Sequence, residues 1–492
     1  MVLQRRGSTV CRDYGSPTPE KRLRARFRPR LLGYRSFEDL PAGINLKGTP
    51  QPADRVRFLT DRTWIDEHGE QQFEHEIIDT MLDMINQAQR LIVLDQFLFN
   101  DLLTGGRPVR NICDELTTAL VNKQQRIPDI EIFFVTDPCN TLYGGLRSVF
   151  FDRLIDAGIK VITTDLDQLR DSSPVYSLFW RIFIRPLGNT TGGVVPNPFG
   201  RTPVTLRSLL HIPNMKANHR KTLIADSGQD WVGLVSTANP HNASYLNRNV
   251  ALQFNGPAVA DLLRSELAVI SMSVGRSPQV CHAVTPLPVA DVTTQVSIHS
   301  EGAIKETLLT LIADTASGDH IDLILFYLSD RAVVKALTEA VKRGVDVRVV
   351  LDPSKDAFGW RKIGIPNRPV ASRLHRDGIN VRWADTQGEQ CHTKMALITN
   401  LGTHEEPATS QLLLGSANYT RRNLDNFNLE CDALLTGPSH TPALAEASTL
   451  FEEVWSNRHN RGYTVDYAVY EERSLVRHVI YWCMEVTGIS TF

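Results

Sequence analysis

The strongest constraint on the fold is an internal repeat, because the same order of predicted strands and helices occurs twice, from about Arg55 and again from about Gln295. Each copy alternates short apolar runs, typical of strands, with longer segments whose apolar residues recur at helical spacing. Strands joined by helices favour a parallel sheet that is covered on both faces. We therefore predict an α/β fold of two pseudo-symmetric α/β/α halves, each with a mixed, largely parallel sheet, and a cleft where the halves meet.

The predicted elements of the two copies correspond in order, and an Asp-Pro pair follows the third strand of each. The first copy is predicted to contain the strand Val56–Leu59, the helix Phe73–Ala88, the strand Leu91–Phe99, the helix Val109–Asn122, the strand Ile130–Thr136, the helix Phe150–Ala157 and the strand Lys160–Thr164. The second copy is predicted to contain, in the same order, Val296–His299, Ala303–Ala316, Ile321–Leu328, Ala332–Arg343, Val345–Leu351, Ser372–Arg376 and Asn380–Trp383.

The repeat and the composition divide the 492 residues into five predicted parts. The parts are a basic N-terminal arm (1–54), a first domain (55–275) with an insert (166–218), a linker (276–294), a second domain (295–460) and a helical C-terminal tail (461–492). The first 35 residues hold ten Lys and Arg residues against two acidic ones. Such an arm is either a solvated tail or a contact for an anionic membrane surface.

The insert is too long for an ordinary loop and needs its own explanation. Its segment Tyr176–Pro186 mixes bulky apolar residues with Arg181 and Arg185, a composition that suits an element at a membrane surface. The alternative is a helix packed over the cleft. The Gly- and Pro-rich run Gly188–Pro203 is predicted to be a loop. For the tail, whose apolar residues have helical spacing around Val479, docking against the body is favoured over membrane binding.

Bulk composition excludes several classes of protein. There are 53 Lys and Arg residues against 55 Asp and Glu, a formal net charge of −2, so no overall positive field would attract a nucleic acid. The seven cysteines are odd in number and include no Cys-x-x-Cys pair, which fits a reducing compartment. No run of about 18 apolar residues and no secretory signal is found, so we predict a soluble or peripheral protein.

The residues that can carry chemistry are the triplets His219-Arg220-Lys221 and His392-Thr393-Lys394. Side chains alternate along a strand, so the His and the Lys of each triplet face the same side. A single histidine in a strand is more often structural than catalytic. Here both the histidines and the lysines stand 173 positions apart within a repeated fold, which favours a shared functional site.

Each triplet is followed by a second apolar strand that ends in a hydroxyl residue and an asparagine. These residues are Thr237 and Asn239 in the first half, and Ser416 and Asn418 in the second. Neutral donors beside a His-Lys pair are suited to binding a phosphate group.

With these residues the chain resembles the phospholipase D superfamily over about 55–455. The pattern of that superfamily is His-x-Lys-x4-Asp followed by Gly-Ser-x-Asn. The resemblance extends to bacterial cardiolipin synthases. It implies two phospholipase D-type halves with the active site at their interface. Asp226 matches the pattern in the first half, but Ser236 replaces the usual Gly, and Thr399 stands at the aspartate position of the second half.

The resemblance also implies a two-step transfer, in which His219 attacks phosphorus to form a phosphohistidine and His392 acts as acid and then base. Lys221, Lys394, Asn239 and Asn418 would hold the non-bridging oxygens, with Thr237 and Ser416 as further donors. Asp226 would have a supporting role. No carboxylate cluster accompanies the motifs, so no metal and no cofactor are predicted.

The supporting residues of the two histidines are predicted to differ. Glu430, twelve residues after Asn418, is the candidate to orient His392, whereas the same count in the first half leads to Ala251 and leaves His219 without a carboxylate. Two other residues are interpreted as structural. Cys391 should point to the core, and His211 should lie in a loop or the core.

The prediction for function is a phosphatidyltransferase or phospholipase D that uses a phosphohistidine and takes phosphatidylglycerol or a similar phospholipid, most simply in transphosphatidylation of the cardiolipin synthase type. Hydrolysis of phospholipids, a metal-independent phosphodiesterase or nuclease, and an inactive membrane-binding scaffold are the alternatives. Peripheral contact with the inner face of the cytoplasmic membrane, or a cytoplasmic location, is expected. Nucleic acid is not the expected partner, and the oligomeric state is left open.

Overall fold

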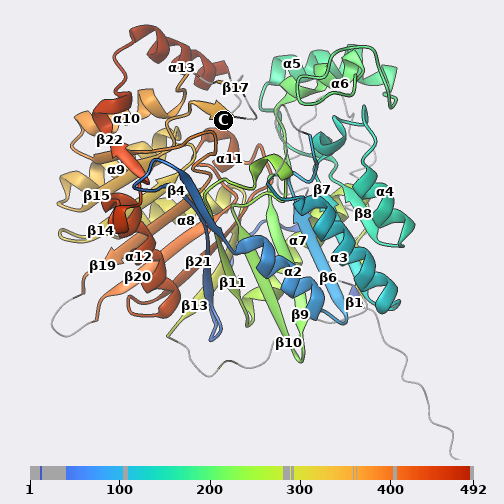
Figure 1. Ribbon diagram of the computed structural model, residues 1–492, viewed down its shortest axis with the longest axis horizontal. Coiled ribbons are helices and arrows are strands. Elements are labelled where there is room, and N and C mark those ends of the chain that lie inside the picture. The colour runs from blue at the N-terminus through green and yellow to red at the C-terminus, as the bar shows by residue number, and fades with distance from the viewer. Residues whose placement is uncertain are drawn as a thin grey trace, which may run out of the picture.

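The computed structural model describes residues 12–13, 40–102, 109–280, 289, 293–357, 360–361, 363–402 and 407–487. Most of the predicted N-terminal arm and much of the predicted linker lie outside these residues. Within them, one sheet has eight strands and another has nine, and the two stand next to each other (Figure 1).

The first half repeats its order of elements in the second half, as the sequence predicts. The first half runs β4 (Arg57–Ile65), β5 (Gln71–His75), α2 (Ile77–Gln87), β6 (Leu91–Gln96), α3 (Ile112–Arg126), β7 (Glu131–Thr136), α4 (Val149–Asp156), β8 (Lys160–Thr163), β9 (Lys221–Ser227), β10 (Asp230–Ser236), β11 (Asn249–Phe254) and α7 (Ala258–Val274). The second runs β13 (Gln295–Ser300), α8 (Gly302–Ala313), β14 (His320–Leu325), α9 (Arg331–Lys342), β15 (Asp346–Leu351), α10 (Asn367–Arg376), β18 (Asn380–Ala384), β19 (Lys394–Asn400), β20 (Thr409–Gly415), β21 (Cys431–Pro438) and α12 (Pro442–Ser456).

The strand order is the same in both sheets apart from edge strands. The first is ordered β5-β4-β11-β10-β9-β6-β7-β8, and the second contains the matching order β13-β21-β20-β19-β14-β15-β18. Short strands extend the second sheet at its edges, β3 (Gln51–Pro52) beside β13 and β22 (Thr464–Asp466) beside β18. The α/β class and the pseudo-symmetric halves are therefore confirmed.

Both sheets are mixed, as predicted, but the prediction that most of their strands pair in parallel is wrong. In the described part of each sheet, parallel pairing is confined to three neighbouring strands, β6-β7-β8 and β14-β15-β18. The remaining named pairs are antiparallel. The reason is that the second part of each half returns through the hairpins β9-β10 and β19-β20 instead of through helical crossovers.

The two sheets share a central core that contains helices α7 and α12. Apolar side chains of both helices join residues from both sheets in one continuous cluster. Separate clusters cover the outer faces, with α2, α3 and α4 on the first sheet and α8, α9 and α10 on the second. Strands buried on both faces explain the uninterrupted apolar runs in the sequence.

Two helical segments project beyond the sheets at the top of the view in Figure 1. In the insert, α5 (Pro174–Phe179) continues into a π-helical turn η5 (Trp180–Ile184) and a short turn η6 (Arg185–Leu187), and α6 (Leu206–His211) follows an irregular stretch. In the tail, α13 spans Leu475–Thr487. No helix in the described ranges is both long and apolar enough to cross a membrane.

Candidate active site

Both triplets lie at the same edge of their sheets. Lys221 opens β9 and pairs with Gln96, the last residue of β6, and Lys394 opens β19 and pairs with Leu325, the last residue of β14. Each triplet is therefore at the carboxyl end of the parallel strands. In sheets of this kind, ligands bind at that edge.

Each triplet is hydrogen bonded to the other half of the molecule. The backbone N–H of His219 donates to the carbonyl of Leu429 at 2.8 Å, and Arg248 N–H donates to the carbonyl of Gln390 at 2.9 Å. The Thr393 hydroxyl also donates to the carbonyl of Arg248, at 3.2 Å. The motifs thus meet at the interface between the halves.

His219 is held by a carboxylate from the second half. Its Nδ1 lies 3.0 Å from Oε2 of Glu430, and both side chains are buried. Glu430 in turn accepts hydrogen bonds from the Ser416 hydroxyl and the Asn423 amide. The prediction that Glu430 orients His392 is therefore wrong, because the two supporting groups cross between the halves.

His392 is held by an amide from the first half. Its Nδ1 lies 3.2 Å from Oδ1 of Asn249, which also accepts a hydrogen bond from the Thr237 hydroxyl at 3.2 Å. The two arrangements have the same geometry but different chemistry, a carboxylate beside one imidazole and an uncharged amide beside the other.

Asn249 is the structural counterpart of Glu430. Ser236 pairs with Ala251 across β10 and β11, and Gly415 pairs with Asp432 across β20 and β21. Asn249 lies two residues before Ala251, and Glu430 lies two residues before Asp432. The connection between the strands is two residues shorter in the first half, which is why counting twelve residues from the motif asparagine misses it.

Thr237 and Ser416 therefore do not serve as the free phosphate donors expected from the sequence. Each hydroxyl donates to the group that supports a histidine and accepts a backbone N–H, from Val250 at 3.0 Å and from Cys431 at 2.9 Å. Their effect on a substrate would be indirect.

The two lysines are buried beside the histidines. Lys221 Nζ donates to the carbonyl of His219 at 2.5 Å and Lys394 Nζ to that of His392 at 2.7 Å. Burial lowers the pKa of Lys221 to about 7, and the carboxylate of Glu430 opposes this shift. Burial and the charge of Lys221 hold the pKa of Lys394 well below its usual value. The site therefore disfavours two adjacent positive charges, and a bound anion would favour them.

The same surroundings keep the histidines neutral. Burial, then Lys221 and Lys394, hold the pKa of His219 well below its usual value. Burial, then Lys394, Lys221 and His219 itself, do the same for His392. With Nδ1 of His219 facing a carboxylate, the proton belongs on Nδ1 and the lone pair on Nε2.

The phenylalanine after each central strand closes the site from one side. The ring of Phe97 lies 4.7 Å from that of His219 and beneath Lys221 Nζ at 5.0 Å. Phe326 takes the same position beside His392, at 5.1 Å, and beneath Lys394 Nζ, at 5.1 Å. These aromatic neighbours limit the entry of water and strengthen electrostatic interactions inside the site.

The motif asparagines are buried at the ends of β10 and β20. The side-chain oxygens of Asn239 and Asn418 have no hydrogen-bond partner among the described residues. Buried polar groups are normally satisfied, so two unsatisfied acceptor oxygens at an active site suggest a ligand that offers a donor, such as a hydroxyl group.

Asp226 does not belong to this site. It is five residues beyond Lys221 along β9, about 16 Å away at the rise of a strand. Its carboxylate accepts the backbone N–H groups of Gln89, Arg90 and Leu91, at 2.9–3.2 Å. Asp226 therefore fixes the turn from α2 to β6.

The middle residue of the first triplet, which the sequence analysis left unassigned, joins the halves from inside the core. The buried guanidinium of Arg220 pairs with Glu301 at 2.6 Å and with Glu266 at 3.4 Å. Glu301 also accepts the N–H of Glu430 at 3.2 Å. The alternation that points His219 and Lys221 into the site points Arg220 to the opposite face.

Cys391 and His211 are structural, as predicted. The pKa of the buried Cys391 thiol is raised to about 12 by burial, so it is not a ready nucleophile. His211 stacks on Tyr143 at 4.0 Å and contacts Trp180 at 4.6 Å. In the part of the chain that the structure describes, no group of three or more His, Cys, Asp or Glu residues is placed to hold a metal ion.

Part of the chain matches a known family model and a curated relative. Residues 308–455 match the family model described as "Cardiolipin synthase, PLD-like domain". The human mitochondrial cardiolipin hydrolase is 29% identical over 166 residues, which cover 34% of this chain and 56% of that protein. This chain therefore spans about half the length of that curated relative.

The likeness to a solved structure extends over both halves. The crystal structure of phosphatidylserine synthase from Haemophilus influenzae Rd KW20 has a TM-score of 0.53 at 11% identity, and the match covers 96% of this chain and 100% of that chain. At this level of identity the comparison concerns the fold.

Proposed function

The chain belongs to the phospholipase D superfamily, and we propose that it is a phosphatidyltransferase of the cardiolipin synthase type that acts through a phosphohistidine. The observation that carries the proposal is the crossed support of the histidines, Glu430 on His219 and Asn249 on His392. Two neutral imidazoles with different partners, beside two lysines, provide a nucleophile and an acid-base group at one phosphate position.

In the first step, Nε2 of His219 attacks phosphorus, and the bond from phosphorus to the leaving alcohol breaks. The leaving oxygen takes a proton from Nε2 of His392, which acquires that proton when the phosphodiester anion binds. The imidazole of His219 becomes positively charged, and the adjacent carboxylate of Glu430 stabilises that charge. An amide beside His392 lacks this effect, which favours His219 as the nucleophile.

Charge on the non-bridging oxygens is balanced by four groups in the proposal. Lys221 and Lys394 supply positive charge, and the amides of Asn239 and Asn418 supply neutral donors. These groups are held in place before the substrate arrives, so the transition state gains stabilisation without rearrangement of the site. Metal-independence remains a prediction, and full activity in excess chelator would be the expected result.

In the second step, His392 takes the proton of the acceptor hydroxyl, whose oxygen attacks phosphorus as the bond to His219 breaks. If the acceptor is the hydroxyl of phosphatidylglycerol, the products are cardiolipin and, from the first step, glycerol. If water is the acceptor, the reaction is hydrolysis. The aromatic rings of Phe97 and Phe326 at the site favour exclusion of water and hence transfer.

Two observations support a phospholipid substrate. The matching family model and the human relative are both named for cardiolipin. The net charge of −2 disfavours a nucleic acid, although cleavage of DNA in chelator would point to the nuclease alternative. We further propose a location in the cytoplasm or at the inner face of the cytoplasmic membrane.

The test is to incubate purified protein with phosphatidylglycerol vesicles and to measure glycerol, cardiolipin and phosphatidic acid by mass spectrometry. Cardiolipin with an equal amount of glycerol supports transfer, and phosphatidic acid with glycerol indicates hydrolysis. If neither product appears, or if His219→Ala gives the same products as the native chain, the proposal is wrong.

Glu430→Gln is expected to change the pH dependence as well as the rate. Burial raises the pKa of Glu430 to about 7, so its carboxylate forms as the pH rises through that value and kcat/KM should rise with it. Lys221 loses its proton in the same range and should produce the falling alkaline limb. The amide of the variant cannot titrate, so the acid limb should flatten and kcat/KM at its maximum should fall about 10- to 100-fold.

The measurement is kcat/KM from about pH 5 to pH 9 for both proteins. Asn249→Gln is the matched control, because it alters the supporting amide of the other histidine without removing a titrating group, and it should keep the acid limb. An unchanged acid limb in Glu430→Gln would contradict the assigned role.

A further inference from the structure

The insert exposes the apolar face of its helix to solvent. Along α5 and η5, side chains at intervals of three and four residues point outward, and Ser177, Trp180 and Ile184 point inward. The outward residues include Val175, which is 85% exposed, and Phe183, which is 62% exposed. Apolar residues thus lie on the inward and the outward side, and a surface helix normally has polar residues on its outward side. The outward apolar residues are Val175, Leu178, Phe179, Ile182 and Phe183.

Helix α13 of the tail has a second exposed apolar face. Leu475 is 82% exposed and Val476 is 67% exposed, and Val479 and Trp482 continue the face along the helix. The opposite side is anchored, because the hydroxyl of Ser329 donates to Glu485 at 2.9 Å. The predicted docking of the tail is therefore correct for one side of α13 only.

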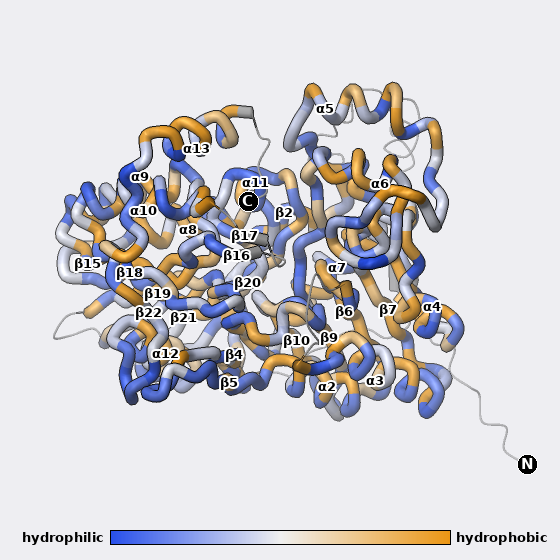
Figure 2. Tube along the Cα trace, turned by 45° about the horizontal axis from the view of Figure 1, so that its top comes forward, coloured by the Kyte–Doolittle hydropathy of each residue, from blue (hydrophilic) through white to orange (hydrophobic). Residues whose placement is uncertain are grey.

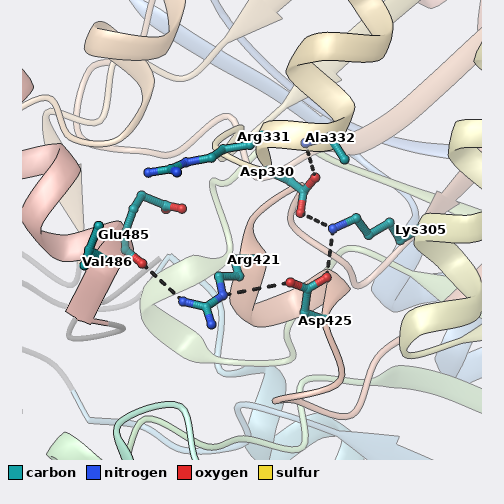
Figure 3. Close-up of a pocket in the computed structure, with 8 residues that line it drawn as sticks. All are labelled: Lys305, Asp330, Arg331, Ala332, Arg421, Asp425, Glu485 and Val486. Carbon is teal, nitrogen blue, oxygen red and sulfur yellow. Dashed lines mark hydrogen bonds and ion pairs between the residues drawn. The ribbon is translucent and has the colours of Figure 1, made fainter.

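The anchor of α13 also borders a polar cavity of about 360 Å³, shown in Figure 3. Inside it, Lys305 pairs with Asp330 at 2.7 Å and with Asp425 at 2.8 Å, and Arg421 donates to the carbonyl of Glu485 at 3.2 Å. The bonds from Arg421 and Ser329 to Glu485 fix the end of α13 to the segments that follow β20 and β14, and Lys305 joins these two segments to each other. The exposed apolar face is therefore presented in a defined orientation.

Both apolar faces lie on the side of the molecule that carries the site. The insert leaves the first sheet after β8, whose carboxyl end is at the same edge as Lys221. Ser329, which holds α13, follows β14, whose last residue Leu325 pairs with Lys394. Figures 1 and 2 show α5 and α13 at the top of the molecule, one above each sheet, and Figure 2 marks much of both segments as hydrophobic.

The charge of the insert complements an anionic surface. Residues 172–216 contain no Asp or Glu. They contain five cations, and three of these, Arg181, Arg185 and Lys216, pair with acidic residues just before the segment, Asp171 and Asp167. A positive segment with bulky apolar side chains fits the interface of a bilayer that carries anionic lipids. The five cations are Arg181, Arg185, Arg201, Arg207 and Lys216.

We propose that the outward faces of α5-η5 and α13 form one docking surface for an anionic lipid bilayer, with the site opening toward the membrane between them. This proposal rests on the proposed function in one respect, because docking would serve to deliver a phospholipid to His219. A bilayer can contact both faces at once because they stand on the same side of the molecule. Insertion of the exposed Phe and Leu side chains supplies apolar burial, and the cations of the insert supply attraction that salt weakens.

The experiment measures binding to vesicles by co-sedimentation, in a His219→Ala background so that no lipid is consumed. Phosphatidylglycerol vesicles are the probe and phosphatidylcholine vesicles the neutral comparison. The variants are Phe179→Asp with Phe183→Asp in the insert, and Val476→Asp with Val479→Asp in α13. Each pair should weaken binding to phosphatidylglycerol vesicles at least about tenfold, because a charge replaces an inserted apolar group.

Leu401→Asp is the matched control. Leu401 is 52% exposed and follows β19 at the end away from Lys394, so this change should leave binding within about twofold. Added salt should weaken binding of the unsubstituted surface to phosphatidylglycerol vesicles and not to phosphatidylcholine vesicles. Equal binding by the docking variants and the control would overturn the proposal. A change of oligomeric state without a change in vesicle binding would also overturn it, since the faces would then bind protein.

Failure of docking and failure of the proposed function give different results. With intact His219, the docking variants should keep full activity on a short-chain phosphodiester in solution and lose activity on vesicles. If the native chain turns over no phospholipid but its vesicle binding still depends on these faces, the docking surface stands and the proposed reaction falls.

Discussion

Replacement of His219 by alanine should lower kcat/KM by about 10⁴-fold or more, the largest effect expected of any single change in this chain. His219 is the group to which phosphorus is transferred in the proposal, His392 is occupied as the acid-base group, and Cys391 is held as a thiol. The measurement is release of p-nitrophenol from a p-nitrophenyl phosphodiester, with folding checked by circular dichroism. A rate within about tenfold of the native chain would exclude His219 as the nucleophile.

His392→Ala provides the matched comparison. An activated leaving group such as p-nitrophenol needs no proton from His392, so the first step should survive while the second slows. A burst of about one p-nitrophenol per site should appear, and a phosphorylated peptide containing His219 should be detected by mass spectrometry. If the burst is instead seen in His219→Ala and the phosphate is found on His392, the two roles are exchanged.

Arg220→Met should have the largest effect on stability, a loss of about 3–5 kcal/mol of unfolding free energy. The guanidinium is fully buried and neutralises Glu266 and Glu301, which would be left as buried charges without a cationic partner. Urea denaturation followed by fluorescence checks this. Arg147→Met is the control, because Arg147 is 74% exposed and its pair with Asp152 should contribute less than about 1 kcal/mol.

A second variant separates loss of the charge network from poor packing. In Arg220→Met with Glu266→Gln and Glu301→Gln, the unpaired charges are gone, and most of the lost stability should return. If the triple variant is as unstable as Arg220→Met alone, the effect comes from the shape of the side chain and the electrostatic account is wrong.

The sequence predicts the repeated elements well and the direction of strand pairing poorly. Uninterrupted runs of apolar residues identify strands such as Leu91–Gln96 to within a few residues, because these strands are buried on both faces. They carry no information on whether the next strand is parallel. The polar strand Gln71–His75 was missed for a related reason, since an exposed edge strand lacks the apolar run.

The site is predicted in its reactive groups and not in their support. His219, Lys221, His392 and Lys394 follow from spacing alone, because a strand fixes which side chains share a face. Glu430 is placed beside the wrong histidine when each half is considered by itself, since the pairing crosses the interface. Similarly, the pattern of the motif cannot show that Asp226 lies at the far end of its strand.

The crossed support also bears on how such a site could diverge. In a dimer of identical halves, each histidine would have to meet the same supporting residue, because one gene would encode both. A single chain with two copies is free of that restriction, and here one copy has Glu430 where the other has Asn249. Two copies in one polypeptide therefore permit different roles for two histidines at equivalent positions.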